Sequence, residues 1–494
     1  MKIKDLLIRQ SSNIANALKH GEKTLTYREW YIESELIAKD ISNKYKEKLQ
    51  CIGIFLPNSI EYAISYFAVM LLDTVLAPIG IQAKAPEIIS TIEYLEIDII
   101  ITNSEYKSIL KQVLEKCNTR KCIYICDEHV MVTINPELDF IEKTDCLMQD
   151  GTENDVAVLL HTSGTTSNPK RVMLTHRNLV ENIESNIASL RLTSKDVVLI
   201  ALPMFFGYCN TAQFLTQLYL GALSIIMDSK VFMPKAFFRI VEKEKITFFT
   251  GVPSMLMMLL SYRYAEKYDY SSLKYIIFGG GIMPVEKLKM LIKRFPTIYF
   301  LQTYGQTECS PRVTLLYPEF SNIKIGSIGT PIPNVSVKIV DKDGNEKNHD
   351  EVGEIIVKGN NVMKGYFKAL DVTEQIISDG WLHTGDLGYK DADGFLFLTG
   401  RIKNIIISGG INIYPEQIEQ ILQQHDAVEN AYVYGEKDEI LGEIPIARVE
   451  LKRACELVEL KKYCKQQLSD YKVPVRFEIV DYISKTYNGK VKRH

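Results

Sequence analysis

The sequence predicts an α/β protein. A large N-terminal lobe of doubly wound α/β subdomains, with a small β-rich subdomain, is followed by a small mobile α+β C-terminal domain. Short aliphatic runs alternate with helical stretches through most of the chain, as they do in parallel β-α units. Beyond Gly326 the pattern changes to short strands and tight turns, and after Gly400 a helix pattern joins the strands. We therefore expect the large lobe at 1–400 and the C-terminal domain at 404–494, joined by residues 401–403.

Length and charge exclude several classes of protein. The chain has 494 residues, of which 46% are hydrophobic, with 28 Gly and 17 Pro, so it can bury large cores and is neither disordered nor collagen-like. Its 58 basic and 61 acidic side chains give a net charge of −3. This balance argues against a generally basic nucleic-acid binder or a polybasic membrane-surface protein. The oligomeric state stays open.

The cysteines and the N-terminus indicate a cytoplasmic protein. Nine cysteines are scattered without metal-ligand spacing, which predicts reduced thiols rather than a disulfide framework. The first residues lack the apolar core of a secretory signal. The most apolar stretch, residues 62–78, contains Asp73 and falls short of the roughly 20 apolar residues of a membrane span. It is predicted to form a buried helix.

Parallel β-α units account for the body of the large lobe. Between residues 51 and 103, aliphatic runs flank the helical stretch SIEYAISYFAVMLLD. The alternation continues in the runs DVVLIALP, ALSIIMDS, ITFFTGVP, LKYIIFGGG and TIYFLQTYGQTE, which have helical patterns between them. Strands in this order favour a doubly wound arrangement.

The last third of the chain predicts the β-rich subdomain and the C-terminal domain. The segment LGYKDADGFLFLTG predicts a hairpin whose turn is the Ala-Asp-Gly at 392–394. Farther on, Pro415 suits the first position of a helix in which Ile418, Ile421 and Leu422 share one face. The strands ENAYVYG, IPIARVEL and VRFEIVDYI and the helix ELVELKKYCKQQL complete this unit.

The segment LLHTSGTTSNPKRVMLTH, residues 159–176, carries the clearest chemical signal. A hydroxyl- and glycine-rich loop after an aliphatic strand offers backbone N–H groups and hydroxyls to phosphate oxygens, and Lys170 adds positive charge. The segment does not match GxxxxGKS or GxxxxGKT, so it is not a P-loop. Taken alone, such a run more often marks a polar surface loop.

Four further segments accompany this loop in a fixed order: YGQTECSP from Tyr304, GWLHTGDLGY from Gly380, GRIKNIIISGGINIYPEQIE from Gly400 and SKTYNGKVKR from Ser484. Together the five segments resemble the adenylate-forming superfamily, which includes acyl-CoA and aryl-CoA synthetases, adenylation domains of peptide synthetases and beetle luciferases. The resemblance extends from about residue 20 to the end of the chain. It implies an enzyme that joins ATP to a carboxylate, releases pyrophosphate and passes the acyl group to a thiol.

The resemblance also implies roles for named side chains. Joining two anions requires neutralised charge and aligned groups. The loop at 162–170 would hold the β- and γ-phosphates, Thr307 would contact the α-phosphate, and Glu308 would bind Mg²⁺, which prefers hard oxygen ligands. Asp386 and Arg401 would hold the ribose, and glycines would lie against the adenine. The implied nucleotide site comprises Thr162, Ser163, Gly164, Thr165, Thr166, Lys170, Gly279, Gly280, Gly281, Tyr304, Asp386 and Arg401.

Two lysines are assigned by the same resemblance to domain movement. Lys490 would bridge the substrate carboxylate and the α-phosphate during adenylation, because an ammonium on a long stem can follow the moving charge. Lys403 would be the hinge whose backbone torsions change when the C-terminal domain rotates. After rotation, the Ser-Gly-Gly at 408–410 would line a channel for the thiol.

The phosphate loop departs from the family pattern at two positions, because Ser167 and Arg171 replace glycines. Ser167 must find acceptable backbone angles, and Arg171 is expected near the phosphates or in solvent. These changes are the only feature that favours a nucleotide-binding protein without catalysis. The retention of Glu308, Asp386 and Lys490 argues against that alternative.

The resemblance implies an acid pocket lined by PMFFGYCNTAQF at 203–214 and by residues around the two glycine-rich turns. The aspartate that usually grips an α-amino group is missing, and Gly207 stands at the asparagine position of dihydroxybenzoate activators, so an α-amino acid is disfavoured. We predict an apolar or aromatic carboxylic acid, although any one of the aromatic rings fits core packing equally well. The implied pocket residues are Phe206, Tyr208, Gly305 and Cys309.

The acceptor thiol has two alternatives. The chain ends shortly after Lys490, so the thiol is expected from a separate molecule, either coenzyme A or the phosphopantetheine of a carrier protein. The text SGGINIYPEQIE favours coenzyme A. A luciferase-type oxygenase would share the adenylating residues, but the chain lacks a peroxisomal ending. The sequence therefore predicts an AMP-forming acid–CoA ligase that uses ATP, Mg²⁺ and coenzyme A.

Overall fold

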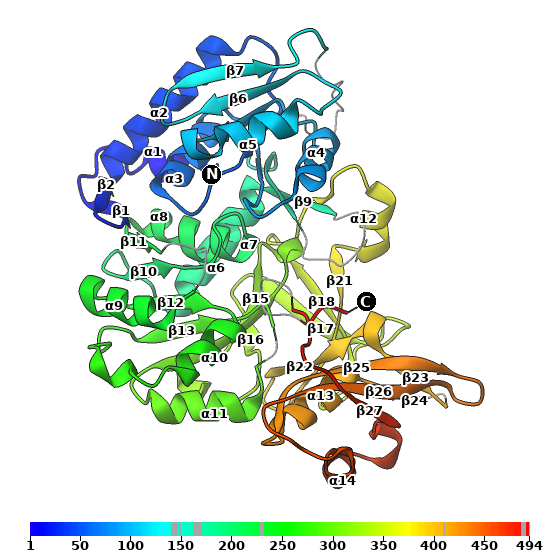
Figure 1. Cartoon of the computed structure of the whole chain (residues 1–494). Helices are drawn as coiled ribbons and strands as arrows, with labels where there is room; N and C mark the ends of the chain where they lie inside the picture. Colours follow the sequence, from blue (N-terminus) through cyan, green and yellow to red (C-terminus); the bar gives the residue numbers. More distant parts are fainter. Residues whose placement is uncertain are drawn as a thin grey trace.

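Four β-sheets organise the computed structural model, which describes residues 1–139, 147, 150–161, 170–227, 232–281, 283–409, 411–485 and 491–493. Figure 1 shows two α/β layers stacked from the top to the lower left, a β-rich part at the right in yellow, and a small orange part at the bottom. This arrangement confirms the predicted fold class. The boundaries predicted around residues 401–403 stay a prediction.

The first sheet lies in the upper part of Figure 1 and has the strand order β19-β9-β8-β4-β3-β5-β6-β7. Its strands are β3 (Cys51–Ile54), β4 (Val75–Pro78), β5 (Ile99–Thr102), β6 (Lys121–Ile125), β7 (Val130–Ile134), β8 (Val156–His161), β9 (Arg171–Thr175) and β19 (Gly365–Tyr366). Its helices are α2 (Tyr27–Lys44), α3 (Ile60–Leu71), α4 (Ala85–Tyr94) and α5 (Ser104–Leu114). The parallel pairing of β4, β3, β5 and β6 is the β-α pattern that the sequence predicts.

Helix α3 is the buried helix that the apolar stretch predicts. Its N-cap residue Ser59 accepts a hydrogen bond from the Tyr62 backbone N–H, which satisfies one of the free donors of the first turn. Most of its side chains are buried, and Phe67 packs edge-on against Trp30 of α2. The helix therefore belongs to the protein core.

The second sheet has the order β16-β15-β14-β13-β12-β10-β11-β1-β2. Its strands are β1 (Asn16–His20), β2 (Lys23–Thr26), β10 (Val197–Ile200), β11 (Leu223–Ile226), β12 (Phe248–Gly251), β13 (Tyr275–Phe278), β14 (Tyr299–Gly305), β15 (Arg312–Leu315) and β16 (Thr330–Pro331). The helical segments around it are α6 (His176–Leu190), α7 (Gly207–Cys209), the π-helix η2 (Asn210–Leu215), α8 (Thr216–Leu220), α9 (Pro234–Glu244), α10 (Pro253–Ser261) and α11 (Val285–Arg294). β10 to β14 are parallel neighbours, whereas β15 returns antiparallel to β14. Loops at the carboxyl ends of such strands are the usual place for a ligand.

The third sheet is the β-rich part, with the order β17-β18-β21-β20 and β22 paired with β21. Its elements are β17 (Val335–Val340), β18 (Gly353–Gly359), α12 (Leu370–Ile376), β20 (Ile377–Ser378), β21 (Trp381–Lys390) and β22 (Leu396–Arg401). β21 and β22 form the predicted hairpin, and Gly394 in its turn has a φ of 88°. This left-handed conformation suits glycine.

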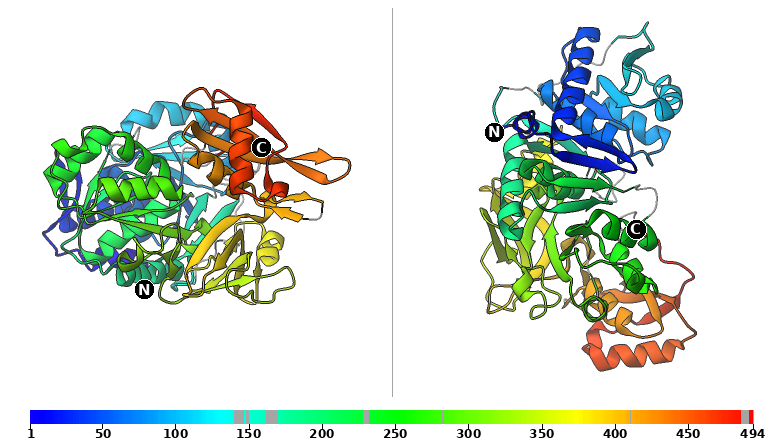
Figure 2. Two further views of the ribbon diagram at one scale, coloured as in Figure 1. Left: turned by 90° about the horizontal axis from the view of Figure 1, so that it is seen from below. Right: turned by 90° about the vertical axis from the view of Figure 1, so that its left-hand side faces the viewer.

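The fourth sheet forms the small part at the bottom of Figure 1, and Figure 2 shows it as a separate body beside the large lobe. Its order is β24-β23-β26-β25, with β27 paired with β26. Its elements are β23 (Ile406–Ser408), β24 (Ile411–Ile413), α13 (Pro415–Gln424), β25 (Val428–Asp438), β26 (Gly442–Leu451), α14 (Leu457–Gln467) and β27 (Arg476–Ile479). Pro415 opens α13 as predicted, and Ile418 and Leu422 are fully buried.

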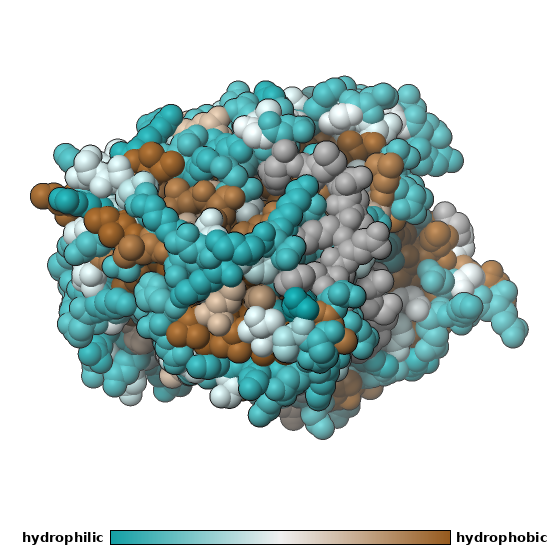
Figure 3. Space-filling view, turned by 90° about the horizontal axis from the view of Figure 1, so that it is seen from above, coloured by the Kyte–Doolittle hydropathy of each residue, from teal (hydrophilic) through white to brown (hydrophobic). Residues whose placement is uncertain are grey.

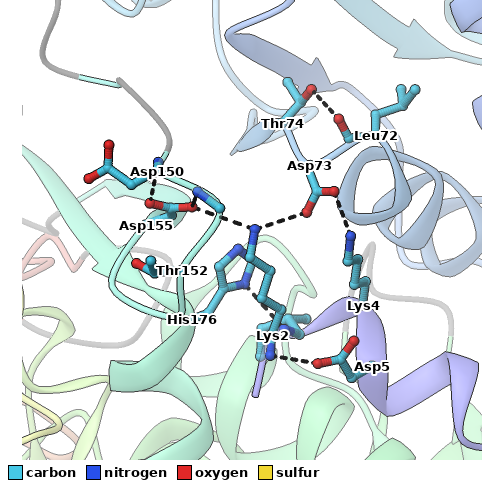
Figure 4. Close-up of polar contacts among 12 residues, drawn as sticks. Lys2, Lys4, Asp5, Leu72, Asp73, Thr74, Asp150, Thr152, Asp155 and His176 are labelled. Carbon is cyan, nitrogen blue, oxygen red and sulfur yellow. Dashed lines mark hydrogen bonds and ion pairs between the residues drawn. The ribbon is translucent and has the colours of Figure 1, made fainter.

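A polar cluster holds the start of the chain against the large lobe (Figure 4). The Lys2 ammonium lies 3.1 Å from Asp73 and 3.5 Å from the buried carboxylate of Asp155. The backbone N–H of Ile3 donates to Nδ1 of His176 at 3.2 Å, just before α1 (Lys4–Ile8). Burial lowers the pKa of His176 to about 4, and the Lys2 ammonium adds to this effect. His176 therefore contributes as a neutral acceptor.

The low pKa of His176 predicts a loss of stability in mild acid. The folded state favours the neutral ring, so its contribution is complete above the unfolded pKa of about 6.5 and is lost as the pH falls towards 4. Between pH 7.5 and 5 we expect the wild type to lose about 2 kcal/mol more unfolding free energy than His176→Gln. Urea unfolding at both pH values measures the difference. His349→Gln, at an exposed histidine, should lose as much as the wild type, and an equal loss in all three proteins would contradict the assignment.

The face seen from above is mainly hydrophilic and carries several separate hydrophobic patches (Figure 3). Exposed aliphatic side chains such as Ile14, Ile32 and Leu36 belong to the N-terminal segments. Within the described ranges, no helix has the length and apolar character needed to cross a bilayer.

Candidate active site

The turn after β14 is fixed by a glycine. A Cβ on Gly305 would lie 1.7 Å from the carbonyl oxygen of Pro311, so only glycine allows β14 and β15 to approach this closely. The turn itself is the 3₁₀ segment η4 (Thr307–Cys309), and its C-cap Ser310 has a φ of 66°. This geometry holds Thr307 and Glu308 at the carboxyl end of the second sheet.

Glu308 and Lys170 both contact Tyr366, Glu308 at the hydroxyl and Lys170 at the aromatic ring. The Tyr366 hydroxyl donates to Oε1 of Glu308 at 2.7 Å, and the Lys170 ammonium lies 4.9 Å from the centre of the same ring. Burial raises the pKa of the Tyr366 hydroxyl, and the Glu308 carboxylate raises it further. Tyr366 therefore stays a hydrogen-bond donor to the carboxylate at neutral pH.

Backbone pairing explains why these groups meet. β19 pairs with β9, so that Tyr366 lies opposite Val172, two residues beyond Lys170. The backbone N–H of Met363, just before β19, donates to the carbonyl oxygen of Glu308 at 2.9 Å. One short segment therefore connects the turn at Glu308 with the strand that follows Lys170.

Asp386 forms a second constellation with Arg401 and Tyr304. The register of the β21–β22 hairpin places Asp386 opposite Arg401, and Nε of Arg401 lies 2.6 Å from Oδ1 of Asp386. The Tyr304 hydroxyl donates to Oδ2 of Asp386 at 2.8 Å. The Asp386 carboxylate is the main cause that raises the pKa of Arg401, and burial raises the pKa of Tyr304 well above its usual value. The arrangement is a buried, oriented carboxylate that suits paired hydroxyl donors.

Helix α7 connects the phosphate side of the site with the second sheet. A Cβ on Gly207 would lie 3.6 Å from Cγ2 of Thr307, so α7 and η4 are in contact. A Cβ on Gly279 would lie 2.8 Å from the carbonyl oxygen of Thr303 and 3.5 Å from the Tyr208 hydroxyl. Gly279 thus allows β13, β14 and Tyr208 to pack closely, and Gly280 has a φ of 77°.

The segment between the third and fourth sheets lies beside the Asp386 constellation. Asn404, at the end of η6 (Ile402–Asn404), donates to Oε1 of Glu416 at 2.6 Å. Burial lowers the pKa of Lys403, and the nearby charges that act on it include Arg401, Asp386 and Arg493. Arg493, near the end of the described chain, and Asp386 therefore both lie close enough to Lys403 to act on its charge.

The final residues are anchored to their own domain. Lys485 and Val491 form an antiparallel bridge, and the Lys492 backbone N–H donates to the Ser484 carbonyl oxygen at 2.9 Å. The Arg493 guanidinium lies 2.7 Å from the Glu419 carboxylate. Burial raises the pKa of Glu419 to about 7. These contacts fix both ends of the segment that contains residue 490.

Several predicted site residues lie outside the described residues. These are Thr162, Ser163, Gly164, Thr165, Thr166, Ser167, Gly410 and Lys490. Their assigned roles stay predictions.

The structure corrects one expectation and adds one residue. Arg171 points neither to solvent nor to an exposed loop: it is buried, and its guanidinium contacts Thr91 at 2.7 Å and the ring of His161. Cys309 is fully buried in the apolar cluster around Tyr304. Tyr366 joins the site without having been predicted, because it does not lie in a segment that the motifs assign to a ligand.

A magnesium ion fits the donor set on one test. Glu308 is 9% exposed, and Tyr366 orients one of its carboxylate oxygens. Mg²⁺ takes carboxylate oxygen together with waters and substrate phosphates, so a single oriented carboxylate near a phosphate loop is sufficient protein ligation.

Comparison with known proteins extends these observations. The AMP-binding enzyme family matches residues 9–367, and the AMP-binding enzyme C-terminal domain matches residues 417–490. The chain is 32% identical over 485 residues to a 2-succinylbenzoate–CoA ligase of Bacillus subtilis (strain 168), covering 97% of this chain and 94% of the relative. It is 31% identical to a long-chain-fatty-acid–CoA ligase of the same organism, covering 97% and 90%.

Solved structures give the same result. The o-succinylbenzoate CoA synthetase of Bacillus subtilis in complex with its acyl-adenylate intermediate has a TM-score of 0.86 at 30% identity, covering 98% of this chain and 96% of that one. The same synthetase with ATP and a magnesium ion has a TM-score of 0.85. The resemblance inferred from the five motifs is confirmed, and the chain belongs to the AMP-binding enzyme family as an AMP-forming acid–CoA ligase.

Proposed function

We propose that this enzyme activates an apolar or aromatic carboxylic acid as its acyl-adenylate and transfers the acyl group to coenzyme A. The relatives named above act on 2-succinylbenzoate and on long-chain fatty acids. The aromatic pair Phe205 and Phe206, with ring centres 5.7 Å apart, precedes α7. The observation that carries the proposal is that Glu308 shares Tyr366 with Lys170 and also acts electrostatically on Arg401, the partner of Asp386.

The residues of this chain act mainly by binding and charge neutralisation. Lys170 and the preceding loop bind the terminal phosphates, and Glu308 binds the magnesium ion that lowers the charge of the phosphate chain. Asp386, held by Arg401 and Tyr304, accepts the ribose hydroxyls. Lys490 bridges the carboxylate and the α-phosphate while the new bond forms.

A pyrophosphate-release screen tests the proposal. Purified protein with ATP and Mg²⁺ is offered fatty, aryl and α-amino acids, each with and without coenzyme A. We expect acid-dependent pyrophosphate release with aryl or fatty acids, and formation of the acyl-CoA when coenzyme A is added. Release without any acyl-CoA would favour a carrier protein as acceptor, and no release with any acid would contradict the proposal.

The ribose assignment gives a separate prediction. Asp386→Asn removes the charge that accepts two hydroxyls, although the amide oxygen can still accept from Tyr304. We expect the KM for ATP to rise about tenfold with a smaller change in kcat, since one charged hydrogen-bond acceptor is lost. Steady-state adenylation kinetics measure this, and Asp393→Asn, in the exposed β21–β22 turn, serves as the control. An unchanged KM for ATP would contradict the assignment.

A further inference from the structure

Arg312, the first residue of β15, is a buried cation without a counter-ion. Its side chain is 1% exposed. Among the described residues, none of its three guanidinium nitrogens has a hydrogen-bond acceptor in proper geometry. Burial lowers the pKa of Arg312, and Tyr208 is the group that acts on it in the opposite direction. No ion pair of the described residues includes this arginine.

The phenol that faces this guanidinium is also buried and lacks a partner. Among the described residues, Arg312 is the hydrogen-bonding group that acts on the Tyr208 hydroxyl, but the two do not reach proper hydrogen-bond geometry. Burial is the larger effect and raises the pKa of Tyr208 to about 12. The phenol is therefore neutral. Its O–H group, like the N–H groups of the guanidinium, can donate a hydrogen bond to a ligand.

Both groups lie near the turn that carries Thr307, the predicted α-phosphate contact. Gly207 contacts Thr307, whereas the neighbouring Tyr208 extends its hydroxyl to Gly279 and Arg312. Arg312 lies opposite Gly305 in the β14–β15 pairing. One tyrosine side chain therefore separates the predicted α-phosphate contact from the unpaired guanidinium, on the side assigned to the acid.

A buried, unpaired guanidinium is stabilised when an anion binds to it. It does not deprotonate at physiological pH, and an unpaired buried charge is strongly unfavourable unless a ligand neutralises it. Its planar N–H groups match the two oxygens of a carboxylate. The Tyr208 hydroxyl can donate to the same group.

We propose that Arg312 and Tyr208 form a subsite for a second carboxylate of the acid substrate, remote from the carboxylate that is adenylated. The inference rests on the proposed function and narrows its substrate class to dicarboxylic acids with an apolar or aromatic body. Reaction at one carboxylate leaves the other intact, so the subsite binds and orients the acid without taking part in bond making.

Matched acids test the subsite. The pairs are hexanedioate with hexanoate and 4-(2-carboxyphenyl)butanoate with 4-phenylbutanoate, assayed by pyrophosphate release. We expect the wild type to prefer at least one diacid, and Arg312→Met to lower kcat/KM for that diacid about 30-fold while changing its monoacid partner little, because one charge-assisted contact is lost. Tyr208→Phe should lower the same preference less. An equal loss for both members of each pair would overturn the inference and assign Arg312 to the reacting carboxylate.

A second readout does not depend on turnover. Because Arg312→Met removes an unpaired buried charge, the ligand-free variant should melt at a temperature equal to or above that of the wild type. The preferred diacid should raise the Tm of the wild type but not that of the variant. Arg171→Met provides the matched control: that buried arginine has partners, so its loss should lower the Tm. A lowered Tm for Arg312→Met with an unchanged diacid shift would overturn the subsite. Wild-type activity restricted to monoacids would overturn it while leaving the proposed function intact.

Discussion

Lys490→Ala slows acyl-adenylate formation about 10²-fold or more, whereas transfer of the acyl group from a preformed adenylate to coenzyme A survives. The expected effect is large because two anions must meet, and a preorganised ammonium stabilises them mainly while the bond forms. The bridge between Lys485 and Val491 and the pairing of Arg493 with Glu419 fix both ends of this segment to the C-terminal domain.

The two half-reactions are measured separately. Pyrophosphate release reports adenylation, and acyl-CoA formation from the synthetic adenylate reports transfer. Lys492→Ala is the matched control, because Lys492 is exposed in the same segment, and it should behave like the wild type. Equal losses in both half-reactions for Lys490→Ala would contradict the assigned role.

Glu308→Gln lowers adenylation about 10²-fold to 10³-fold and raises the Mg²⁺ concentration needed for half-maximal rate. Glutamine has the same shape as glutamate, and its amide oxygen can still accept the hydrogen bond from the Tyr366 hydroxyl. The substitution therefore removes the negative charge without changing the local fold. A neutral amide is a poor ligand for Mg²⁺ compared with a carboxylate.

Adenylation rates over a Mg²⁺ titration check this result. Tyr366→Phe is the companion variant, because it removes the hydrogen bond but keeps the carboxylate, and it should lose roughly tenfold or less. An unchanged Mg²⁺ dependence in Glu308→Gln would remove Glu308 from the metal site.

Local patterns predicted most of the elements. The run LKYIIF became β13, and the amphipathic pattern after Tyr414 became α13, because strand and helix periodicity depend on neighbouring residues. The sequence did not predict that β1 and β2 extend the second sheet beside β11, some two hundred residues away. It also did not predict the π-helix η2, whose buried residues include Asn210 and Gln213. Long-range pairing and tertiary packing decide both features.

In the candidate site, too, contacts set by neighbouring residues could be predicted, whereas contacts set by distant segments could not. Asp386 and Arg401 lie opposite each other in a hairpin that the turn residues predict. Their contact could therefore be expected from neighbouring residues in the sequence. Tyr366 reaches Glu308 only because β19 pairs with β9, and Arg312 is unpaired only because distant segments enclose it. Of the two alternatives for Arg171, the position in solvent is wrong, because packing against Thr91 buries the side chain.

The short strand β19 orders the backbone of the proposed ATP site before ATP binds. Hydrogen bonds tie this segment to the backbone of Glu308 at one end and to the strand beginning at Arg171 at the other. Main-chain hydrogen bonds thus fix the position of the Glu308 backbone relative to the strand that follows Lys170. The backbone around the proposed phosphate and magnesium ligands is therefore ordered before ATP binds, so little binding free energy is needed to order it.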